Sequence, residues 1–328
     1  MGQYWIIVNI DAKTYMSFSV KKLGEWLLRP QTGLSMMATL VPPLVNTEDS
    51  RLDDSLIRSG SSDNELGQLS LPTELLGKIF EELDDDVFHV GSLCLANSTL
   101  WTIGYSYFIE AVGRHTAHWG GDRVICVGDY AEDLPDGILS KEEMDNLETD
   151  SAWDGSLYHY AWEEYDDYEL QIRSLLVRVK GHIASLQSSP SEMKAWQQLI
   201  TPLEELLDVY WTRQDYLRDD QWILCNLSQK EYARGAYLKE MVGDALSLGD
   251  VVLSQICWSQ DPSTALRYKG NIYQGRWAGD RFAVYNRDVF EGRDDRQDWE
   301  DVSQKVIGET LAIRRAEYGK RWPVKKHH

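Results

Sequence analysis

YWIIVNIDAKTY, residues 4–15, returns much later in the chain as QWILCNLSQKEY, residues 221–232. Both stretches place a Trp, three apolar residues, an Asn and a further apolar residue ahead of a Lys and a Tyr at the same spacing. A match of this length at fixed spacing indicates a repeated unit. The polar positions that the two copies share here are Asn9 and Asn226, and Lys13 and Lys230.

A second pair of matching blocks follows in the same order. WGGDRVICV begins at Trp119 and WAGDRFAV begins at Trp277. From the shared Asn to the shared Asp, the first copy spans 113 positions (122 − 9) and the second spans 54 (280 − 226), a difference of 59. We therefore expect an insertion within the first copy. The polar positions shared in these blocks are Asp122 and Asp280, and Arg123 and Arg281.

The repeated blocks carry the alternating apolar pattern of β-strands. Residues 4–20 alternate around a turn at residues 11–13, which predicts a hairpin, and the apolar residues 123–127 predict a buried strand. Patterns typical of helices follow, and Pro30 is expected to stop the first of them. Strands mixed with helices in this order predict the α+β class. The expected helices lie at residues 22–28, 34–40, 239–248 and 302–315.

A segment of different character lies inside the first copy. Residues 46–70 are mostly Ser, Asp, Glu, Asn and Gly, and they are too polar to bury a face, which favours a flexible linker. Beyond them, apolar side chains recur at helical spacing after a Leu-Pro start. They form one stripe: Leu75, Leu76, Ile79, Phe80 and Leu83.

This segment resembles an F-box. The resemblance rests on the Leu-Pro start, the Glu-Leu-Leu and Ile-Phe groups of the first helix, and the later pairs Leu93-Cys94 and Leu100-Trp101. It covers roughly 40 residues and implies three helices whose apolar stripe docks a Skp-family adaptor protein. It departs from the family's pattern in the loop at residues 85–87 and at Asn97-Ser98, where that family has basic residues. A plain helical insert is the alternative.

The full prediction is therefore two related α+β domains from an internal duplication, with an F-box-like helical insertion in the first copy. The expected parts are a first copy at residues 1–45 and 113–180, a linker at 46–70, the insert at 71–112, connecting helices at 181–220 and a second copy at 221–328.

Composition narrows the classes of function. A total of 33 Lys and Arg against 53 Asp and Glu gives a formal net charge of −20, which repels nucleic acid. No apolar run reaches the roughly 20 residues that a membrane helix needs. We expect neither a nucleic-acid partner nor a membrane partner. The four cysteines form no C-x-x-C pair, which favours a reducing compartment, the cytoplasm or the nucleus.

The repeated blocks also resemble a known family. Met-Gly-Gln-Tyr-Trp at residues 1–5, the Trp-x-Gly-Asp-Arg block and Val-Gly-Asp-Tyr-Ala-Glu-Asp at residues 127–133 are similar to the marks of a family of uncharacterised bacterial and fungal proteins. The resemblance covers both copies but not the insert. It implies no activity, so it assigns no catalytic residue.

Carboxylates beside the predicted strands supply the candidates for catalysis. Apolar residues followed by Gly128-Asp129 and Asp133 resemble the magnesium-holding part of haloacid-dehalogenase-like phosphatases. Those enzymes also need a strand that ends in Asp-x-Asp, and residues 9–11 supply only one of the two carboxylates. We predict no cofactor outside this alternative, in which magnesium is the expected ion. The candidate residues are Asp11, Asp122, Arg123, Asp129 and Asp133.

Two functions of different class remain open. The first is an intracellular protein-interaction module, at its most specific an F-box-like substrate receptor of a ubiquitin ligase. The second is an enzyme with a pocket between the two copies and magnesium-dependent phosphoryl or other hydrolytic chemistry. The two differ in whether the candidate polar groups converge in a pocket or bind their own backbone.

Overall fold

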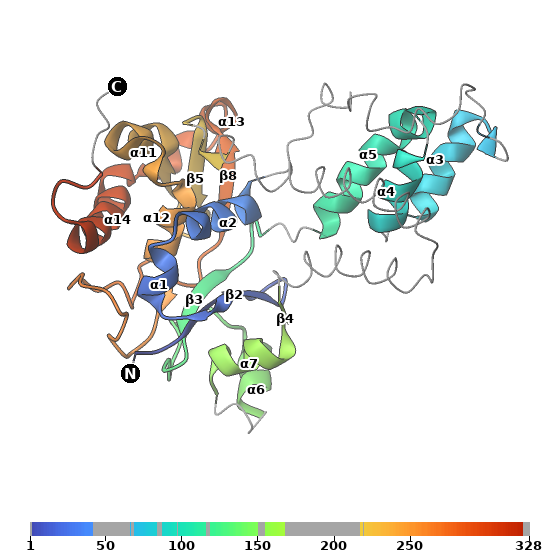
Figure 1. The fold of residues 1–328 in the computed structure, drawn as a ribbon. Coiled ribbons are helices and arrows are strands. Elements are labelled where there is room, and N and C mark those ends of the chain that lie inside the picture. Colours follow the sequence, from blue (N-terminus) through green and yellow to red (C-terminus); the bar gives the residue numbers. More distant parts are fainter. Residues whose placement is uncertain are drawn as a thin grey trace, which may run out of the picture. The chain divides into compact units, whose positions relative to one another are not determined.

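The structure is a computed structural model that describes residues 2–41, 66, 69–83, 87–96, 98–115, 119–149, 155–167, 217–218 and 220–323. These residues form a mixed α+β fold with two mixed sheets (Figure 1). The chain divides into two compact units. The sheet unit comprises Met1–Pro42, His118–Glu169 and Arg213–His328, and the helical unit comprises Pro43–Ala117 and Leu170–Thr212.

The first sheet contains five strands in the order β4-β2-β1-β3-β7. The central strand β1 runs antiparallel to β2 and β3, whereas β4 joins β2 and β7 joins β3 in parallel. The expected hairpin and the expected buried strand are confirmed as β1, β2 and β3. The strands are β1 (Trp5–Asn9), β2 (Thr14–Lys21), β3 (Val124–Gly128), β4 (Asp166–Asp167) and β7 (Cys257–Trp258).

The second sheet has the order β8-β5-β6-β9. This is the order of β3, β1, β2 and β4 in the first sheet, with the same antiparallel and parallel pairings. The register also agrees, because Trp5 pairs with Gly128 as Trp222 pairs with Asn286. The strands are β5 (Trp222–Asn226), β6 (Glu231–Arg234), β8 (Phe282–Asn286) and β9 (Glu300–Asp301).

Two helices follow the hairpin in each half of the sheet unit. Pro30 begins the second of these helices instead of only ending the first, because proline fits the first turn of a helix, where its missing N–H is not needed. The first half has α1 (Leu23–Leu27) and α2 (Pro30–Leu40), and the second has α11 (Gly235–Val242) and α12 (Leu248–Gln255), separated by a 3₁₀ turn at Gly243–Ala245. The remaining helices of the unit are α6 (Lys141–Thr149), α7 (Leu157–Glu164), α13 (Arg287–Glu291), a 3₁₀ turn at Arg296–Asp298 and α14 (Ser303–Tyr318).

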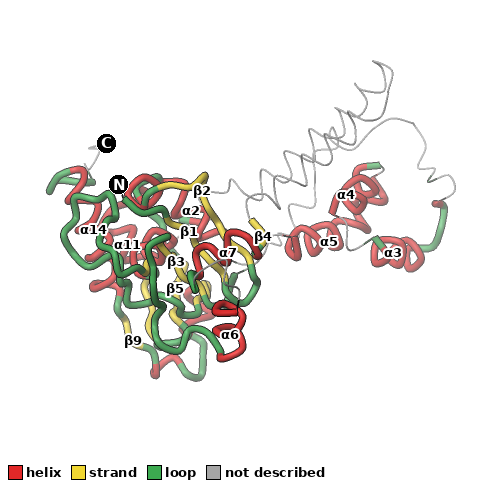
Figure 2. Tube along the Cα trace, turned by 90° about the horizontal axis from the view of Figure 1, so that it is seen from below, coloured by secondary structure: helices red, strands yellow, loops and turns green. Residues whose placement is uncertain are grey.

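Helices α6 and α7 cover one face of the first sheet. They lie together in both views (Figures 1 and 2). Side chains at alternate positions of β1 meet Leu147 of α6 and Leu157 and Tyr158 of α7 in one buried cluster. Because strand side chains alternate between faces, this cluster contains Ile6, Val8 and Ile10, and Trp5, Ile7 and Asn9 lie on the opposite face.

Helices α2 and α12, one from each half, cross at two glycines. A Cβ on Gly249 would lie 1.9 Å from the carbonyl oxygen of Gly33, and a Cβ on Gly33 would lie 2.2 Å from Oδ2 of Asp250. Neither position has room for a side chain, so the two backbones make close contact. The crossing fixes the two halves against each other.

The expectation of two separate α+β domains needs correction, because both sheets lie in one compact unit. Strand β7 follows α12 of the second half but pairs with β3 of the first. An isolated antiparallel bridge also joins Arg123 to Arg281. These backbone contacts cross between the halves and join them within one unit, although the second half also has a buried cluster of its own that includes Ile223, Tyr232 and Phe290.

The helical unit includes the segment that the sequence predicts to be an insert. Its described helices are α3 (Thr73–Glu82), α4 (Val87–Leu95) and α5 (Ser98–His115), gathered as one group in Figure 2. They share a core that includes Leu76, Phe80, Cys94, Trp101 and Phe108. Most of the predicted linker at residues 46–70 and of the predicted connecting helices at residues 181–220 lies outside the described residues.

We expect the Gly249→Ala substitution to destabilise the protein by about 1–3 kcal/mol, because its methyl group would overlap the Gly33 carbonyl oxygen. Chemical denaturation of the purified protein measures this. Gly308→Ala in α14 is the matched control, since a Cβ there meets no atom within 4 Å. It should be neutral or stabilise by about 0.5–1 kcal/mol. Equal stability of the two variants would contradict the close crossing.

Candidate functional site

In both halves, an Asn–Asp pair joins the hairpin to the loop that begins with the shared Trp. Nδ2 of Asn9 donates to Oδ2 of Asp122 at 2.9 Å, and Nδ2 of Asn226 donates to Oδ2 of Asp280 at 2.8 Å. The amide oxygen of each Asn accepts backbone N–H groups of the hairpin turn, from Ala12 in the first half. The second half does the same with Ser228 and Gln229. These buried amides are therefore used to hold the turn.

The shared Lys residues complete the same turns. Lys13 has φ 52° and Lys230 has φ 53°, so both adopt the left-handed conformation that is uncommon for a residue with a side chain. The next strand begins directly after each of them. The repeated Lys therefore marks a backbone conformation, and the amide oxygen of the preceding Asn stabilises that turn.

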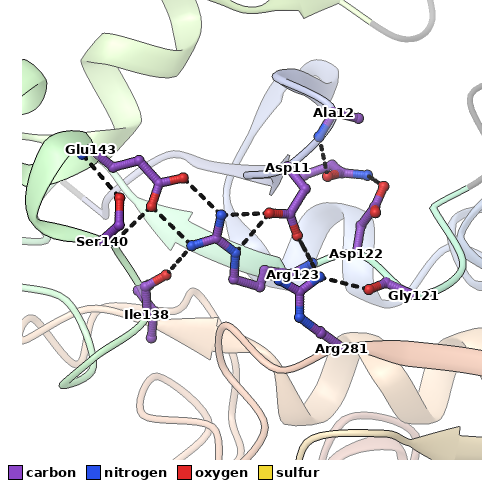
Figure 3. Close-up of polar contacts among 10 residues, drawn as sticks. Asp11, Ala12, Gly121, Asp122, Arg123, Ile138, Ser140, Glu143 and Arg281 are labelled. Carbon is purple, nitrogen blue, oxygen red and sulfur yellow. Dashed lines mark hydrogen bonds and ion pairs between the residues drawn. The ribbon is translucent and has the colours of Figure 1, made fainter.

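Arg123 lies at the centre of a network of charged groups (Figure 3). Its guanidinium donates to Oδ1 of Asp11 through Nε at 2.9 Å and to Oε1 of Glu143 through Nη2 at 2.7 Å. It also donates to the carbonyl oxygen of Ile138 at 2.6 Å. Ser140 and Glu143 form a capping box at the start of α6. Arg123 thus ties the hairpin turn to the start of α6.

Asp11 serves both halves of the sheet unit. Its carboxylate accepts the Arg123 backbone N–H at 2.8 Å and also Nη1 of Arg281, the corresponding residue of the second half, at 2.8 Å. Burial alone would raise the pKa of Asp11, but the hydrogen bonds from Arg123 and the charges of both arginines outweigh it and lower the pKa. The hydrogen bond from Arg123 likewise lowers the pKa of Glu143 to about 2.

The polar groups of this network are occupied by one another and by backbone. Arg281 has a second acceptor in the carbonyl oxygen of Gly121, at 2.7 Å. Asp122 is held by Asn9. Candidates that bind their own chain in this way fit a structural role better than a catalytic one. Four of the candidate polar positions do lie together: Asp11, Asp122, Arg123 and Arg281.

The other two candidates lie elsewhere. Asp129 follows the far end of β3, roughly 20 Å from Arg123 for six residues at the rise of a β-strand. Its Oδ1 accepts the Tyr4 backbone N–H at 2.9 Å, and burial raises its pKa. The carbonyl oxygen of Asp133 accepts Nε1 of Trp258 at 3.0 Å.

The arrangement expected for magnesium is therefore not assembled. It requires Asp11 and Asp129 to lie together, whereas the antiparallel pairing of β1 with β3 places them at opposite ends of those strands. Within the described ranges, no group of three or more His, Cys, Asp and Glu side chains could hold a metal ion.

The apolar stripe of α3 divides between core and surface. Leu76 is 2% exposed and Phe80 is fully buried, so both belong to the core of the helical unit. Ile79 and Leu83 are partly buried against that core, and Leu75 is 45% exposed. Leu76 and Phe80 are therefore not available to a partner. Sequence periodicity cannot separate the two groups, because a three-helix unit buries only one side of its first helix.

Comparisons of the chain with protein-family models, with curated proteins and with solved structures found no match. In the part of the chain that the structure describes, no helix is both long enough and apolar enough to cross a membrane.

We expect Asp11→Ser to destabilise the protein by about 1.5–3 kcal/mol, because two guanidinium groups lose a shared carboxylate. The serine keeps an acceptor for the Arg123 backbone N–H, just as Ser228 accepts the Arg281 backbone N–H at 3.0 Å in the second half. The variant therefore isolates the charge. Chemical denaturation measures the loss, and Asp136→Ala in an exposed loop is the control. A stability equal to that of the control would show that the shared carboxylate contributes little.

Proposed function

We propose that this chain is an intracellular protein-interaction module, in which the helices α3 to α5 act as an F-box-like domain that binds a Skp-family adaptor. The sheet unit would then present the surface that recognises a substrate for ubiquitin transfer. The observation that carries the proposal is the exposure of Leu75 on a helix whose opposite side fills its own core.

The exposed side of α3 has the chemistry of a docking surface. Leu71 is 37% exposed and Leu75 is 45% exposed, and they lie four residues apart at the start of the helical unit. Ile79, another four residues on, remains partly exposed. Leu75 and Ile79 lie on α3 at a spacing that places them on one side of the helix, and Leu71 lies just before its start. Exposed apolar side chains on one side of a helix are a common feature of helix-binding interfaces.

A pull-down with a purified Skp-family adaptor tests the proposal. The unmodified chain should retain the adaptor, and Leu71→Asp combined with Leu75→Asp should weaken retention by about tenfold or more, because the desolvated contact would then contain charges. Both side chains are exposed, so the variant should unfold at the same denaturant concentration as the unmodified protein.

Val289→Asp in α13 is the matched control, since Val289 is 61% exposed but belongs to the sheet unit. This control should retain the adaptor fully. If the unmodified chain retains no adaptor, the F-box-like function is wrong.

We also propose that the sheet unit arose by internal duplication, with the helical segment inserted into the first copy. Strand order, register, the Asn–Asp pair and the left-handed Lys agree in the two halves. The backbone hydrogen bonds between the two halves are reciprocal as well. The Gly121 N–H donates to the Phe282 carbonyl at 2.7 Å, and the Gly279 N–H donates to the Val124 carbonyl at 3.0 Å.

The ends of the proposed insertion meet at a hydrogen bond. The Trp119 N–H donates to the Thr39 carbonyl at 2.7 Å across 80 positions (119 − 39). In the second half, the Trp277 N–H donates to the Gln255 carbonyl at 2.9 Å across only 22 positions (277 − 255). The same closure is thus reached with and without the intervening segment, which supports an insertion.

Replacing residues 43–117 by a Gly-Ser linker that restores the spacing of the second half should leave the sheet unit folded, because its core lies outside that segment. Denaturation followed by tryptophan fluorescence should show one cooperative transition. A variant that unfolds gradually, without a cooperative transition, would place these helices in the main core.

A further inference from the structure

Two cysteines lie opposite each other where the two halves of the sheet unit meet. Cys126 lies on β3 of the first half, and Cys257 begins β7, which follows α12 of the second half. The two residues are register partners in the parallel pairing of these strands. A hydrogen bond from the Cys126 backbone N–H to the Ile256 carbonyl oxygen, at 2.9 Å, fixes that register. Both thiols are free and fully buried.

The positions of the two residues suit a disulfide. Neighbouring strands lie about 4.7–4.9 Å apart, and the Cα atoms of disulfide-bonded cysteines lie about 4.4–6.8 Å apart. Register partners on adjacent strands also point their side chains to the same face of the sheet. Burial raises the pKa of the Cys126 thiol, and a side-chain hydrogen bond with Cys257 raises it further. That hydrogen bond places the two sulfur atoms within reach of each other.

The shared fold does not require a cysteine at either position. Cys126 corresponds to Val284, four residues after the shared Asp in each half. Cys257 corresponds to Val41, since each lies two residues after the carbonyl that accepts the shared Trp N–H. Both valines are buried. Because valine fills these places in the other half, packing alone does not explain why two thiols meet here.

We propose that Cys126 and Cys257 form a reversible disulfide when the chain meets a peroxide, and that this bond joins the two halves covalently. One sulfur is oxidised to a sulfenic acid as the O–O bond of hydrogen peroxide breaks and one water leaves. The other sulfur then attacks it, the S–S bond forms and a second water leaves. Two thiols thus lose two electrons and two protons, and one peroxide becomes two waters. The proposal does not depend on the adaptor function.

Burial controls the rate of this reaction. The thiolate is the reacting form, and the raised pKa of Cys126 keeps it scarce in the closed structure. Strand β7 has two residues and lies at one end of its sheet, so local opening of this strand is the expected route by which peroxide reaches the pair. In a reducing compartment, a bond formed in this way is transient and responds to oxidant.

Peptide mapping of the full chain tests the disulfide. The reduced protein is treated with hydrogen peroxide, unfolded in an alkylating agent and cut with trypsin. Trypsin cuts after Lys and Arg, so the four cysteines fall in four different peptides. We expect two of the four thiols to be lost and the peptides that contain Cys126 and Cys257 to be linked. Dithiothreitol should restore all four thiols.

The oxidised chain should also unfold at a higher temperature than the reduced chain. The bond closes a loop of 131 positions (257 − 126), which constrains the unfolded state. We expect the Tm to rise by about 5 °C or more. Dithiothreitol should reverse the rise.

Variants taken from the other half assign the bond. Cys126→Val introduces the residue that stands at the corresponding position of the second half, and it should abolish both the linked peptides and the rise in Tm. Cys225→Val is the matched control, since Cys225 is also fully buried and corresponds to Val8 of the first half. The control should lose two thiols and gain Tm as the unmodified chain does.

The proposal is overturned if peroxide produces no link between the Cys126 and Cys257 peptides, or if it links a pair that includes Cys94 or Cys225. It is also overturned if the linked chain has no higher Tm than the reduced chain. The mapping uses the unmodified protein, so it gives a decision even where Cys126→Val does not fold.

Discussion

The sheet unit depends on one carboxylate shared by two arginines. Arg123 and Arg281 occupy corresponding positions in the two halves, and their backbones face each other in an antiparallel bridge. Two guanidinium groups brought this close would repel each other without an anion between them. Asp11 supplies that anion from the hairpin turn and accepts hydrogen bonds from both. The contact between the halves, the position of the hairpin and the start of α6 all rest on this group.

Local patterns in the sequence predicted local structure well, and they predicted long-range pairing poorly. Alternation and helical spacing suffice for β1, β2, β3 and the helices of the insert, because neighbouring residues determine them. The pairing of β7 with β3, which merges the halves into one unit, involves only two residues of β7 and leaves no periodic signal. Among the site residues, the repeat singled out Arg123 and Arg281, and Asp11 was a candidate as a carboxylate beside a strand, but the sequence does not say whether they bind a ligand or one another.

The polar groups of this protein fall into two classes with different meanings. Asn9 and Asn226 lie in the same surroundings in both halves and have protein partners, as expected of residues that maintain a framework. Lys305, which is exposed, and Glu309, which is half-buried, belong to the second half and lie on α14. A polar residue that both halves share therefore stabilises the fold, whereas a binding or catalytic site is better sought among polar groups without protein partners. The candidates chosen from the sequence were mainly of the first class.

The position that corresponds to Asp11 in the second half is Ser228, and this difference makes the two halves non-interchangeable. An assembly of two first halves would bring two carboxylates to the two arginines at the contact between the halves. An assembly of two second halves would bring none. The second assembly would leave a pair of positive charges in a partly desolvated contact, which strongly opposes association. Because only the first half carries the acid, the two halves can pair with each other, whereas two second halves would lack the anion that their arginines need.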